Sequence, residues 1–383
     1  MTRIVATIIV FLALQGCTSP NPAYCDSDSD CTDPAFPVCD TTIHGCVGTG
    51  AGNDGGPVAD QQDESTGTDG DGPSESDGGQ DGQQDQPIFV DDDNCPGPGS
   101  GTEEDPYCTI QQAIDDASKT GRPVTVMPGK YRENLRINGD VDITGSAGTE
   151  IETTSCPGIL VMNHAEAKLS NLEIAGEGGV RVTADSTVSI LECTIRGTAC
   201  TGIDCQDSTC TVERTLIIDN EQGGINLSNS TYTIMNTMVV RNGQSGTFGG
   251  MQIRRPGAGS AISLVTIASN RTAGTNPAGV TCLTPAVIDS SIVWGNGEEP
   301  SNQVSGSCTL NWCDVDQNPS TLTGSNNISQ DPQFIDEENG DFHIRTDSPC
   351  IDRANPAASA EEDFDGQARP QGSGPDIGAD EAR

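Results

Sequence analysis

The residues best suited to chemistry lie near the C-terminal end of the chain. Residues 363–366 read Asp-Phe-Asp-Gly, and carboxylate oxygens are the ligands that a hard cation such as Ca²⁺ prefers. Arg369, Asp376 and Asp380 follow closely. An arginine among carboxylates is equally typical of an ion-pair cluster inside a protein, so metal binding and internal ion pairing both remain open for this segment.

Other residue types with catalytic potential are isolated. The chain has three single histidines, which are His44, His164 and His343. We expect each to be an incidental polar residue rather than a general base. Alternating aspartates at residues 26–30 are similar to the start of an EF-hand loop, but Cys31 occupies the position of the turn glycine and Pro37 that of the bidentate glutamate. The sequence therefore predicts no catalytic residue, no metal site and no cofactor.

Charge and composition exclude several classes of protein. The 383 residues include 57 acidic and 18 basic side chains, which gives a formal charge of −39. Nucleic-acid binding depends on Lys and Arg neutralising phosphates, so no nucleic-acid partner is expected. Sixteen cysteines are typical of an oxidising compartment.

The first 16 residues predict an export signal. Arg3 precedes the apolar run at 4–14, which is too short to span a bilayer. Residues 14–17, Leu-Gln-Gly-Cys, resemble a bacterial lipobox, although Gln15 replaces the usual small residue. The resemblance implies that Cys17 is lipidated and that the membrane is a partner through this lipid. The alternative is an ordinary secretory signal with Cys17 as a half-cystine.

The next two segments predict a stalk. Besides Cys17, residues 17–47 hold four cysteines in a segment too short for a hydrophobic core, which favours a small module with two disulfides. These cysteines are Cys25, Cys31, Cys39 and Cys46. Residues 48–87 are rich in Gly, Asp, Gln and Ser and nearly free of apolar side chains, so they predict a disordered acidic linker.

Residues 88–383 carry a repeat. Pairs of apolar residues separated by one residue return about every 21–27 residues, and each pair places two side chains on one face of a strand. The first column is Leu172/Ile174, Cys193/Ile195, Leu216/Ile218, Met238/Val240, Val265/Ile267 and Ile292/Trp294. The second column is Val180/Val182, Ile203/Cys205, Ile225/Leu227, Met251/Ile253 and Val280/Cys282. The third is Val188/Ile190, Cys210/Val212 and Tyr232/Ile234.

Three short strands per period predict an all-β fold, a right-handed parallel β-helix whose stacked coils bury one continuous core. A glycine precedes each second-column pair, where we expect a sharp turn. These glycines are Gly179, Gly202, Gly224, Gly250 and Gly279.

Two sets of polar residues follow the repeat. One set follows the first column and predicts an asparagine ladder that satisfies backbone groups between coils. Its members are Asn220, Asn242, Asn270 and Asn296. The other lies between second-column residues and predicts an outward polar stripe that could face a glycan, although any β-helix must expose polar residues there. Its members are Arg181, Asp204, Asn226, Gln252 and Thr281.

The ends of this domain resemble a known family. Thr109 to Gln112 form a capping box, apolar residues share one face, and Gly121 ends the pattern, so residues 110–118 predict a capping helix. Residues 88–117 and 124–137 resemble the N-terminal cap and first coil of the pectin-lyase-like β-helix superfamily, and 331–352 and 363–381 resemble its closing coil. The resemblance implies the fold for residues 88–383 without an activity.

Members of that superfamily include lyases, which use carboxylate-bound calcium with an Arg or Lys base, and hydrolases, which use clustered aspartates. Residues 254–256, Arg-Arg-Pro, are similar to part of the pectate lyase element, but no arginine follows at the required spacing. The sequence therefore favours a lipoprotein of the cell envelope, at the outer membrane or cell surface. It would present the β-helix for binding or structural use, with a polysaccharide or surface protein as partner. The alternative is a carbohydrate-active enzyme, a polysaccharide lyase or glycoside hydrolase, with non-standard catalytic residues.

Three expectations concern packing. Eleven cysteines fall in residues 88–383, so at least one is free or pairs between chains; Cys193 fits a buried thiol, and Cys95–Cys108 is the expected bridge. Ile217, Val239 and Val293 lie between paired apolar residues and should point outward. We expect a chain segment between about residues 310 and 342, or a partner, to cover them.

Overall fold

The computed structural model describes residues 38–40, 45–47, 86–274, 277–297, 303–358 and 360–382. The chain divides into two compact units, residues 1–76 and 77–383. The predicted signal peptide, Cys17 and nearly all of the predicted linker lie outside the described residues.

The described residues of the first unit, 38–40 and 45–47, form a pair of short strands. β1 (Val38–Asp40) pairs antiparallel with β2 (Gly45–Val47), with Cys39 opposite Cys46. Among the residues described in either unit, no helix is long and apolar enough to cross a membrane.

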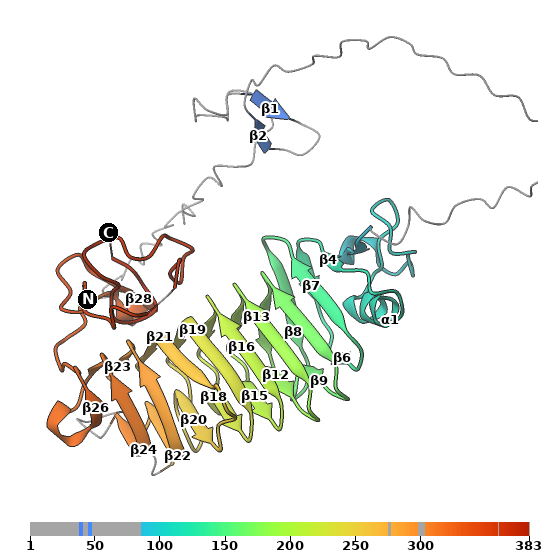
Figure 1. Ribbon diagram of the computed structural model, residues 1–383. Helices are drawn as coiled ribbons and strands as arrows, with labels where there is room; N and C mark the ends of the chain where they lie inside the picture. Colours follow the sequence, from blue (N-terminus) through green and yellow to red (C-terminus); the bar gives the residue numbers. More distant parts are fainter. Residues whose placement is uncertain are drawn as a thin grey trace, which may run out of the picture. The chain divides into compact units, whose positions relative to one another are not determined.

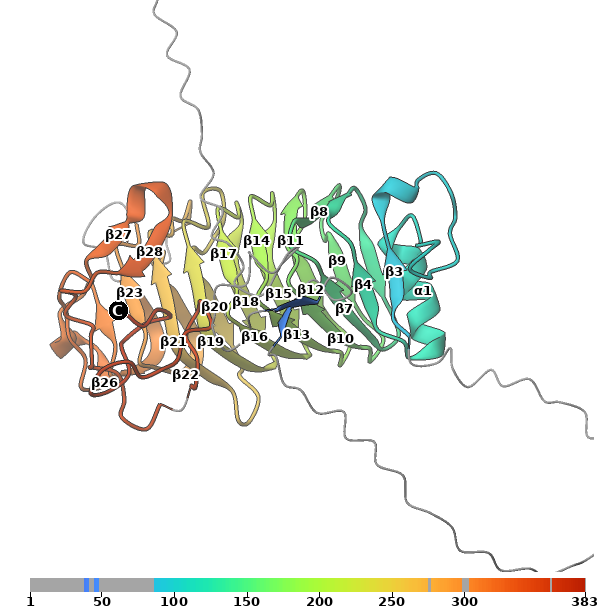
Figure 2. The same cartoon turned by 90° about the horizontal axis from the view of Figure 1, so that it is seen from above.

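The second unit is a parallel β-helix in which each coil adds a short strand to each of three stacks (Figures 1 and 2). Stack 1 contains β3 (Ile88–Val90), β4 (Val124–Val126), β7 (Val141–Gly145), β10 (Glu166–Ser170), β13 (Thr187–Leu191), β16 (Thr209–Glu213), the start of β19 (Thr231–Val240), the start of β21 (Ala261–Ala268), the end of β22 (Val280–Asp289), the end of β24 (Val304–Asn311) and β26 (Thr323–Ser325). Stack 2 contains β5 (Gly129–Tyr131), β8 (Thr149–Thr153), β11 (Glu173–Gly176), β14 (Thr194–Arg196), β17 (Leu216–Ile218), the ends of β19 and β21, β23 (Ile292–Trp294) and β25 (Asp314–Val315). Stack 3 contains β6 (Leu135–Ile137), β9 (Ile159–Val161), β12 (Val180–Val182), β15 (Thr201–Gln206), β18 (Gly223–Ser228), β20 (Met251–Arg254) and the starts of β22 and β24.

Each strand pairs in parallel with its counterpart in the next coil, so the backbone groups that one coil leaves open are hydrogen-bonded between coils. From β10 onward, the turn from stack 1 to stack 2 is made by one residue per coil with a positive φ. In neighbouring coils these residues include Glu192, Arg214 and Asn236. A single left-handed residue turns the chain sharply enough for two short strands to meet at a corner.

A helix closes the N-terminal end of the solenoid. α1 (Ile110–Thr120) begins at Thr109, whose hydroxyl accepts a hydrogen bond from the Gln112 backbone N–H, and ends at Gly121 with φ of 72°. Its buried residues, Ile110, Ala113, Ile114 and Ala117, pack against the first coils. The predicted capping helix is therefore confirmed, and it extends two residues beyond the expected end.

The predicted facing is wrong for three of the six first-column pairs, which are Leu216/Ile218, Met238/Val240 and Ile292/Trp294. The pair Val265/Ile267 faces inward as predicted. Ile217, Val239 and Val293 are fully buried in the central core rather than exposed on the surface. The register aligns Ile195 with Ile217 and Ile217 with Val239. The inward positions here are therefore odd-numbered, and the flanking apolar pairs point outward. Both faces of these strands are apolar, so alternation alone does not identify the inner face.

The outward pairs are covered by residues 331–382, which we call the closing lobe. Outward residues of stack 2 change from charged in the early coils, such as Glu150 and Glu173, to apolar in later ones, such as Met238 and Ile292. The lobe contains β27 (Phe334–Asp336) and β28 (Asp341–Ile344), and it lies beside β21 and β23 in Figure 1. Three 3₁₀ turns complete the described elements: η2 (Asp92–Asn94), η3 (Pro319–Thr321) and η4 (Glu337–Asn339).

The covering segment overlaps the expected one in part. Residues 303–325 do not lie over the stripe, because β24, β25 and β26 continue the coils after Trp294. Phe334 and Phe342, within the expected segment, and Ala379, beyond it, pack against Met238 and Val240. Coverage by the chain itself is therefore confirmed, but the covered residues are the outward pairs and not Ile217, Val239 and Val293.

The cysteines of this unit are all described. Disulfides join Cys95 to Cys108, Cys156 to Cys200, Cys205 to Cys210, and Cys282 to Cys308. The remaining three, Cys193, Cys313 and Cys350, are free and buried. The Cys95–Cys108 bridge and the buried Cys193 thiol are confirmed.

Candidate functional site

The polar stripe runs along the outer face of stack 3. Strand register places Arg181 beside Asp204, Asp204 beside Asn226, Asn226 beside Gln252, and Gln252 beside Thr281. The five side chains predicted from sequence therefore lie on five successive coils. Ser305 of β24 continues the row next to Thr281, and Leu160 of β9 precedes Arg181.

Hydrogen bonds within the stripe fix part of it. Arg181 Nε donates to Asp204 Oδ2 at 2.9 Å, and Asn226 Nδ2 donates to Asp204 Oδ1 at 2.8 Å. Gln206 also donates to both oxygens of Asp204. Asp204 is buried, and both of its carboxylate oxygens already accept hydrogen bonds. The groups that can still contact a ligand are the two terminal nitrogens of Arg181, the side-chain oxygen of Asn226 and the side-chain amide of Gln252.

The predicted asparagines form a column inside the turn between stacks 2 and 3. Asn220, Asn242, Asn270 and Asn296 are buried, and each side-chain amide donates to the side-chain oxygen of the next residue at 2.9–3.1 Å. Thr198 precedes this column and Gln303 ends it. Each amide also donates to a backbone carbonyl, as Asn220 does to Ile195 at 3.0 Å. These residues are buried and structural.

The glycines beside the ladder have a role that differs from the expected sharp turn. A Cβ on Gly224 would lie 2.4 Å from a methyl carbon of Val239 and 3.2 Å from Nδ2 of Asn242, and φ of Gly224 is not in the left-handed region. Gly202 has the same relation to Ile217 and Asn220. Glycine is therefore required because the ladder and core occupy the space of its side chain.

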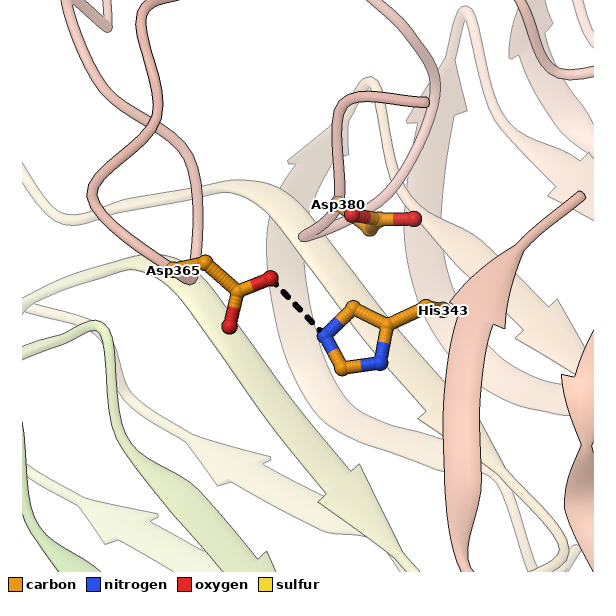
Figure 3. Close-up of side chains that lie close together, drawn as sticks. All are labelled: His343, Asp365 and Asp380. Atoms are coloured by element: carbon orange, nitrogen blue, oxygen red, sulfur yellow. Dashed lines mark ion pairs between the residues drawn. The ribbon is translucent and has the colours of Figure 1, made fainter. Parts of the chain in front are cut away.

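A second polar cluster lies in the closing lobe. His343 comes from β28, Asp365 from the Asp-Phe-Asp-Gly turn, and Asp380 from the C-terminal segment (Figure 3). His343 Nε2 lies 3.0 Å from Asp365 Oδ2, and its Nδ1 lies 2.6 Å from Asp341 Oδ1. Ligand atoms of His343, Asp365 and Asp380 all lie within 4.8 Å of one another.

Local hydrogen bonds hold these side chains in place. Asp341 and His343 alternate along β28 and so share one face. Asp363 turns inward and accepts the backbone N–H groups of Asp365 and Gln367, which directs Asp365 outward. Asp380 accepts the backbone N–H of Ile344 at 2.7 Å, which joins the C-terminal segment to β28.

The rest of the acidic segment is internal. Arg369 is buried, pairs with Glu381 at 3.4 Å and donates to the carbonyl oxygens of Asp376, Gly378 and Ala379. The ion-pair interpretation of the sequence thus describes Arg369. Of the two carboxylates at 363–366, only Asp365 reaches the surface cluster.

Burial and charge act in opposite directions in the cluster. Contact with the Asp365 carboxylate raises the pKa of His343 to about 9, although burial opposes this shift. Burial raises the pKa of Asp380 above its ordinary value, while its hydrogen bond from Ile344 and the charge of His343 lower it. His343 thus lies among acidic neighbours that the sequence did not connect with it, and its partner Asp341 was missed. The Asp-x-His spacing on one strand was the available signal.

The cluster lines a cavity of about 530 Å³. Other lining residues include Ile335, Arg345 and Gln367. A cavity of this size can hold a small molecule and keeps the cluster accessible from solvent.

A comparison with family models supports the architecture of residues 131–266. A family described as "Right handed beta helix region" matches residues 131–266. The chain is a right-handed parallel β-helix protein. Among solved structures, that of pectate lyase Pel9A is 10% identical with a TM-score of 0.44, covering 78% of this chain and 98% of that one. A mutant of the periplasmic alginate epimerase AlgG is 12% identical with a TM-score of 0.31, covering 55% of this chain and 63% of that one. No curated protein matches the chain.

The β-helix therefore carries two separate polar sites. The stripe on stack 3 offers hydrogen-bond donors and acceptors in a row, without a carboxylate free to act as a base. The cluster in the closing lobe offers an imidazole and carboxylates at the wall of a cavity. The first arrangement suits binding of an extended polar ligand, and the second suits binding of a cation.

Proposed function

We propose that this protein is a lipid-anchored protein of the cell envelope that binds an extended glycan along stack 3 of its β-helix. The observation that carries the proposal is the row formed by Arg181, Asn226 and Gln252, whose polar groups remain available on an ordered face. Thr281 and Asp204 are buried, so the accessible polar groups of the row are those of Arg181, Asn226 and Gln252. Neighbouring strands are about 4.8 Å apart, so these three residues span about 14 Å.

An extended chain of sugar rings is the ligand that this row suits best. Its hydroxyls recur at short, regular intervals, so several coils can each donate or accept one hydrogen bond. Arg181 is preorganised by its ion pair with Asp204, which reduces the side-chain entropy lost on binding. Cys156 and Cys200, which form a disulfide, border a small hollow beside Arg181. This disulfide limits the directions from which a glycan chain can approach Arg181.

The test is a panel of neutral and acidic polysaccharides, assayed for retention and for depolymerisation with and without Ca²⁺. We expect retention without depolymerisation, and weaker retention for Asn226→Ala and Gln252→Ala. Thr211→Ala, on the outer face of stack 1 in β16, is the matched control and should bind as the wild type does. Equal binding by the stripe variants and the wild type would remove the stripe as the site. Depolymerisation would favour the carbohydrate-active enzyme instead.

The anchor rests on the sequence of residues 14–17 and is tested separately. The wild-type chain should incorporate a labelled fatty acid and pellet with membranes after a salt wash. Cys17→Ser should do neither and should appear in the soluble exported fraction. If the variant still pellets with membranes, the chain is held there by something other than this lipid.

A further inference from the structure

The cluster of His343, Asp365 and Asp380 has the composition of a divalent-metal site. An imidazole nitrogen and two carboxylates come from three separate segments of the closing lobe and meet within 4.8 Å. Three protein ligands with one position open to a cavity are typical of accessible zinc sites. The sequence left metal binding open for the 363–366 segment but assigned no metal ligand and did not connect His343 with it.

Asp341 prepares His343 for such a role. Its Oδ1 lies 2.6 Å from Nδ1 of His343, so it fixes the ring orientation and leaves Nε2 facing Asp365 and Asp380. A carboxylate on the far nitrogen of a metal-binding histidine is the usual way in which proteins orient this ligand and raise its basicity.

One atom of the cluster lacks a hydrogen bond. Nε2 of His343 is buried and lies near Asp365 without the alignment of a hydrogen bond. Asp380 is only 6% exposed, and its Oδ2 accepts the Ile344 N–H. A buried polar atom without a hydrogen bond is costly, and a bound cation would satisfy Nε2 of His343.

Charge points in the same direction. A metal ion can bind Nε2 only when His343 is a neutral imidazole, and three carboxylates, those of Asp341, Asp365 and Asp380, then surround it. The nearby guanidinium groups do not offset these formal negative charges, because Arg345 pairs with Asp347 and Arg369 pairs with Glu381. A divalent cation would offset two of the three formal negative charges.

We propose that His343 Nε2, Asp365 and Asp380 bind one divalent transition-metal ion, of the type of Zn²⁺, with the fourth position open to the 530 Å³ cavity. The nitrogen ligand favours Zn²⁺ over Ca²⁺ or Mg²⁺, which prefer oxygen alone. Ligand bonds of about 2.0–2.2 Å require the three side chains to move closer together, and Asp365 on its exposed turn can make this movement.

The test uses the purified full chain without a polyhistidine tag, stripped by a chelator and then dialysed against Zn²⁺ with metal analysis. We expect one zinc ion per chain that His343→Ala and Asp365→Asn both lose. Asp341→Asn should retain the site with about 10–100-fold weaker affinity, as for other partners of metal-binding histidines. Binding of Co²⁺ should give a visible absorption spectrum that disappears in the same variants.

Matched controls are His164→Asn, at the other described histidine, and Glu104→Gln, at an exposed carboxylate near the N-terminal end of the β-helix unit. Both should bind zinc as the wild type does. Zinc uptake that is absent in the wild type, or that persists unchanged in His343→Ala and Asp365→Asn, would overturn the proposal and leave the cluster as an ion pair. If His343→Ala fails to fold by circular dichroism, Asp365→Asn decides, since its side chain lies on the surface.

Discussion

The side-chain amide of Asn242 donates to the side-chain oxygen of Asn270 at 3.1 Å, and the backbone N–H of Asn242 donates to the same oxygen at 2.9 Å. The Asn242 amide also donates to the carbonyl oxygens of Ile217 and Val240. The side chain of Asn242 therefore donates hydrogen bonds to backbone carbonyls in two coils, and it also donates to the next asparagine of the column. This arrangement couples the coils at a turn, where no strand pairing is available.

Replacement of Asn242 should strongly destabilise the β-helix. Asn242→Ala removes the acceptor for the Asn220 N–H and the donors to two carbonyls, and each buried group left without a partner costs about 1–3 kcal/mol. We expect the free energy of unfolding to fall by about 3 kcal/mol, measured by urea denaturation. Asn138→Ala, at an exposed position on the same solenoid, should change it by less than about 0.5 kcal/mol. Similar values for the two variants would contradict a stabilising ladder.

The neighbouring glycine should be equally intolerant of a side chain. Gly224→Ala places a Cβ 2.4 Å from a Val239 methyl and 2.6 Å from the Gly250 carbonyl oxygen, so the coil must shift. Overpacking of this kind costs about 1–3 kcal/mol, visible as a lower Tm. Gly374→Ala meets only ordinary contacts of 3.7 Å or more and serves as the control. Stability unchanged in Gly224→Ala would show that the turn can relax.

The repeat made most of the solenoid predictable because coils repeat the same physical requirements. Val188 and Ile190, for example, alternate with polar neighbours and are correctly predicted to face inward. The prediction failed at Leu216, Ile217 and Ile218, where all three residues are apolar. A strand buried on both faces has no alternation to read, and the covering lobe that makes the second face apolar lies more than 100 residues away.

The lobe cluster was less predictable for a related reason. The sequence identified Asp380 and the 363–366 turn as polar and acidic, but it did not connect them with His343. These residues are joined only when the lobe folds on itself, through the Asp380 hydrogen bond to Ile344. No repeat constrains that contact, so spacing along the chain does not reveal it. The stripe was easier, because the β-helix register alone aligns its members.

The covering contact of the closing lobe should contribute substantially to stability. Phe342 is fully buried against Met238 and Val240 and packs edge-to-face on Phe334 with ring centroids 5.2 Å apart. Phe342→Ala should cost about 3–5 kcal/mol and expose the apolar face of stack 2, which binding of a hydrophobic dye would detect. Val287→Ala, at a side chain that is 54% exposed, is the control. A small loss with no dye binding would mean that the lobe is not held by this contact.

The buried carboxylate of Asp314 should make the protein more stable at mildly acidic pH. Burial raises the pKa of Asp314 from 3.8 to about 6, and neighbouring Asp331 and Asp316 act in the same direction. The folded state therefore binds this proton more tightly than the unfolded chain does. By linkage, the free energy of unfolding falls as the pH rises from about 4 to about 6 and then stays low, with a loss on the order of 2–3 kcal/mol from this group. Asp376, with a pKa raised to about 6 by burial, contributes with the same sign.

The Asp314→Asn variant tests this assignment. Asparagine keeps an acceptor for the Gln330 N–H without the charge. The variant should therefore be more stable than the wild type at pH 7.5, and its free energy of unfolding in urea denaturation should depend less on pH. A wild-type protein whose stability rises between pH 4 and pH 6, or a variant with the same profile as the wild type, would contradict the assignment of this proton to Asp314.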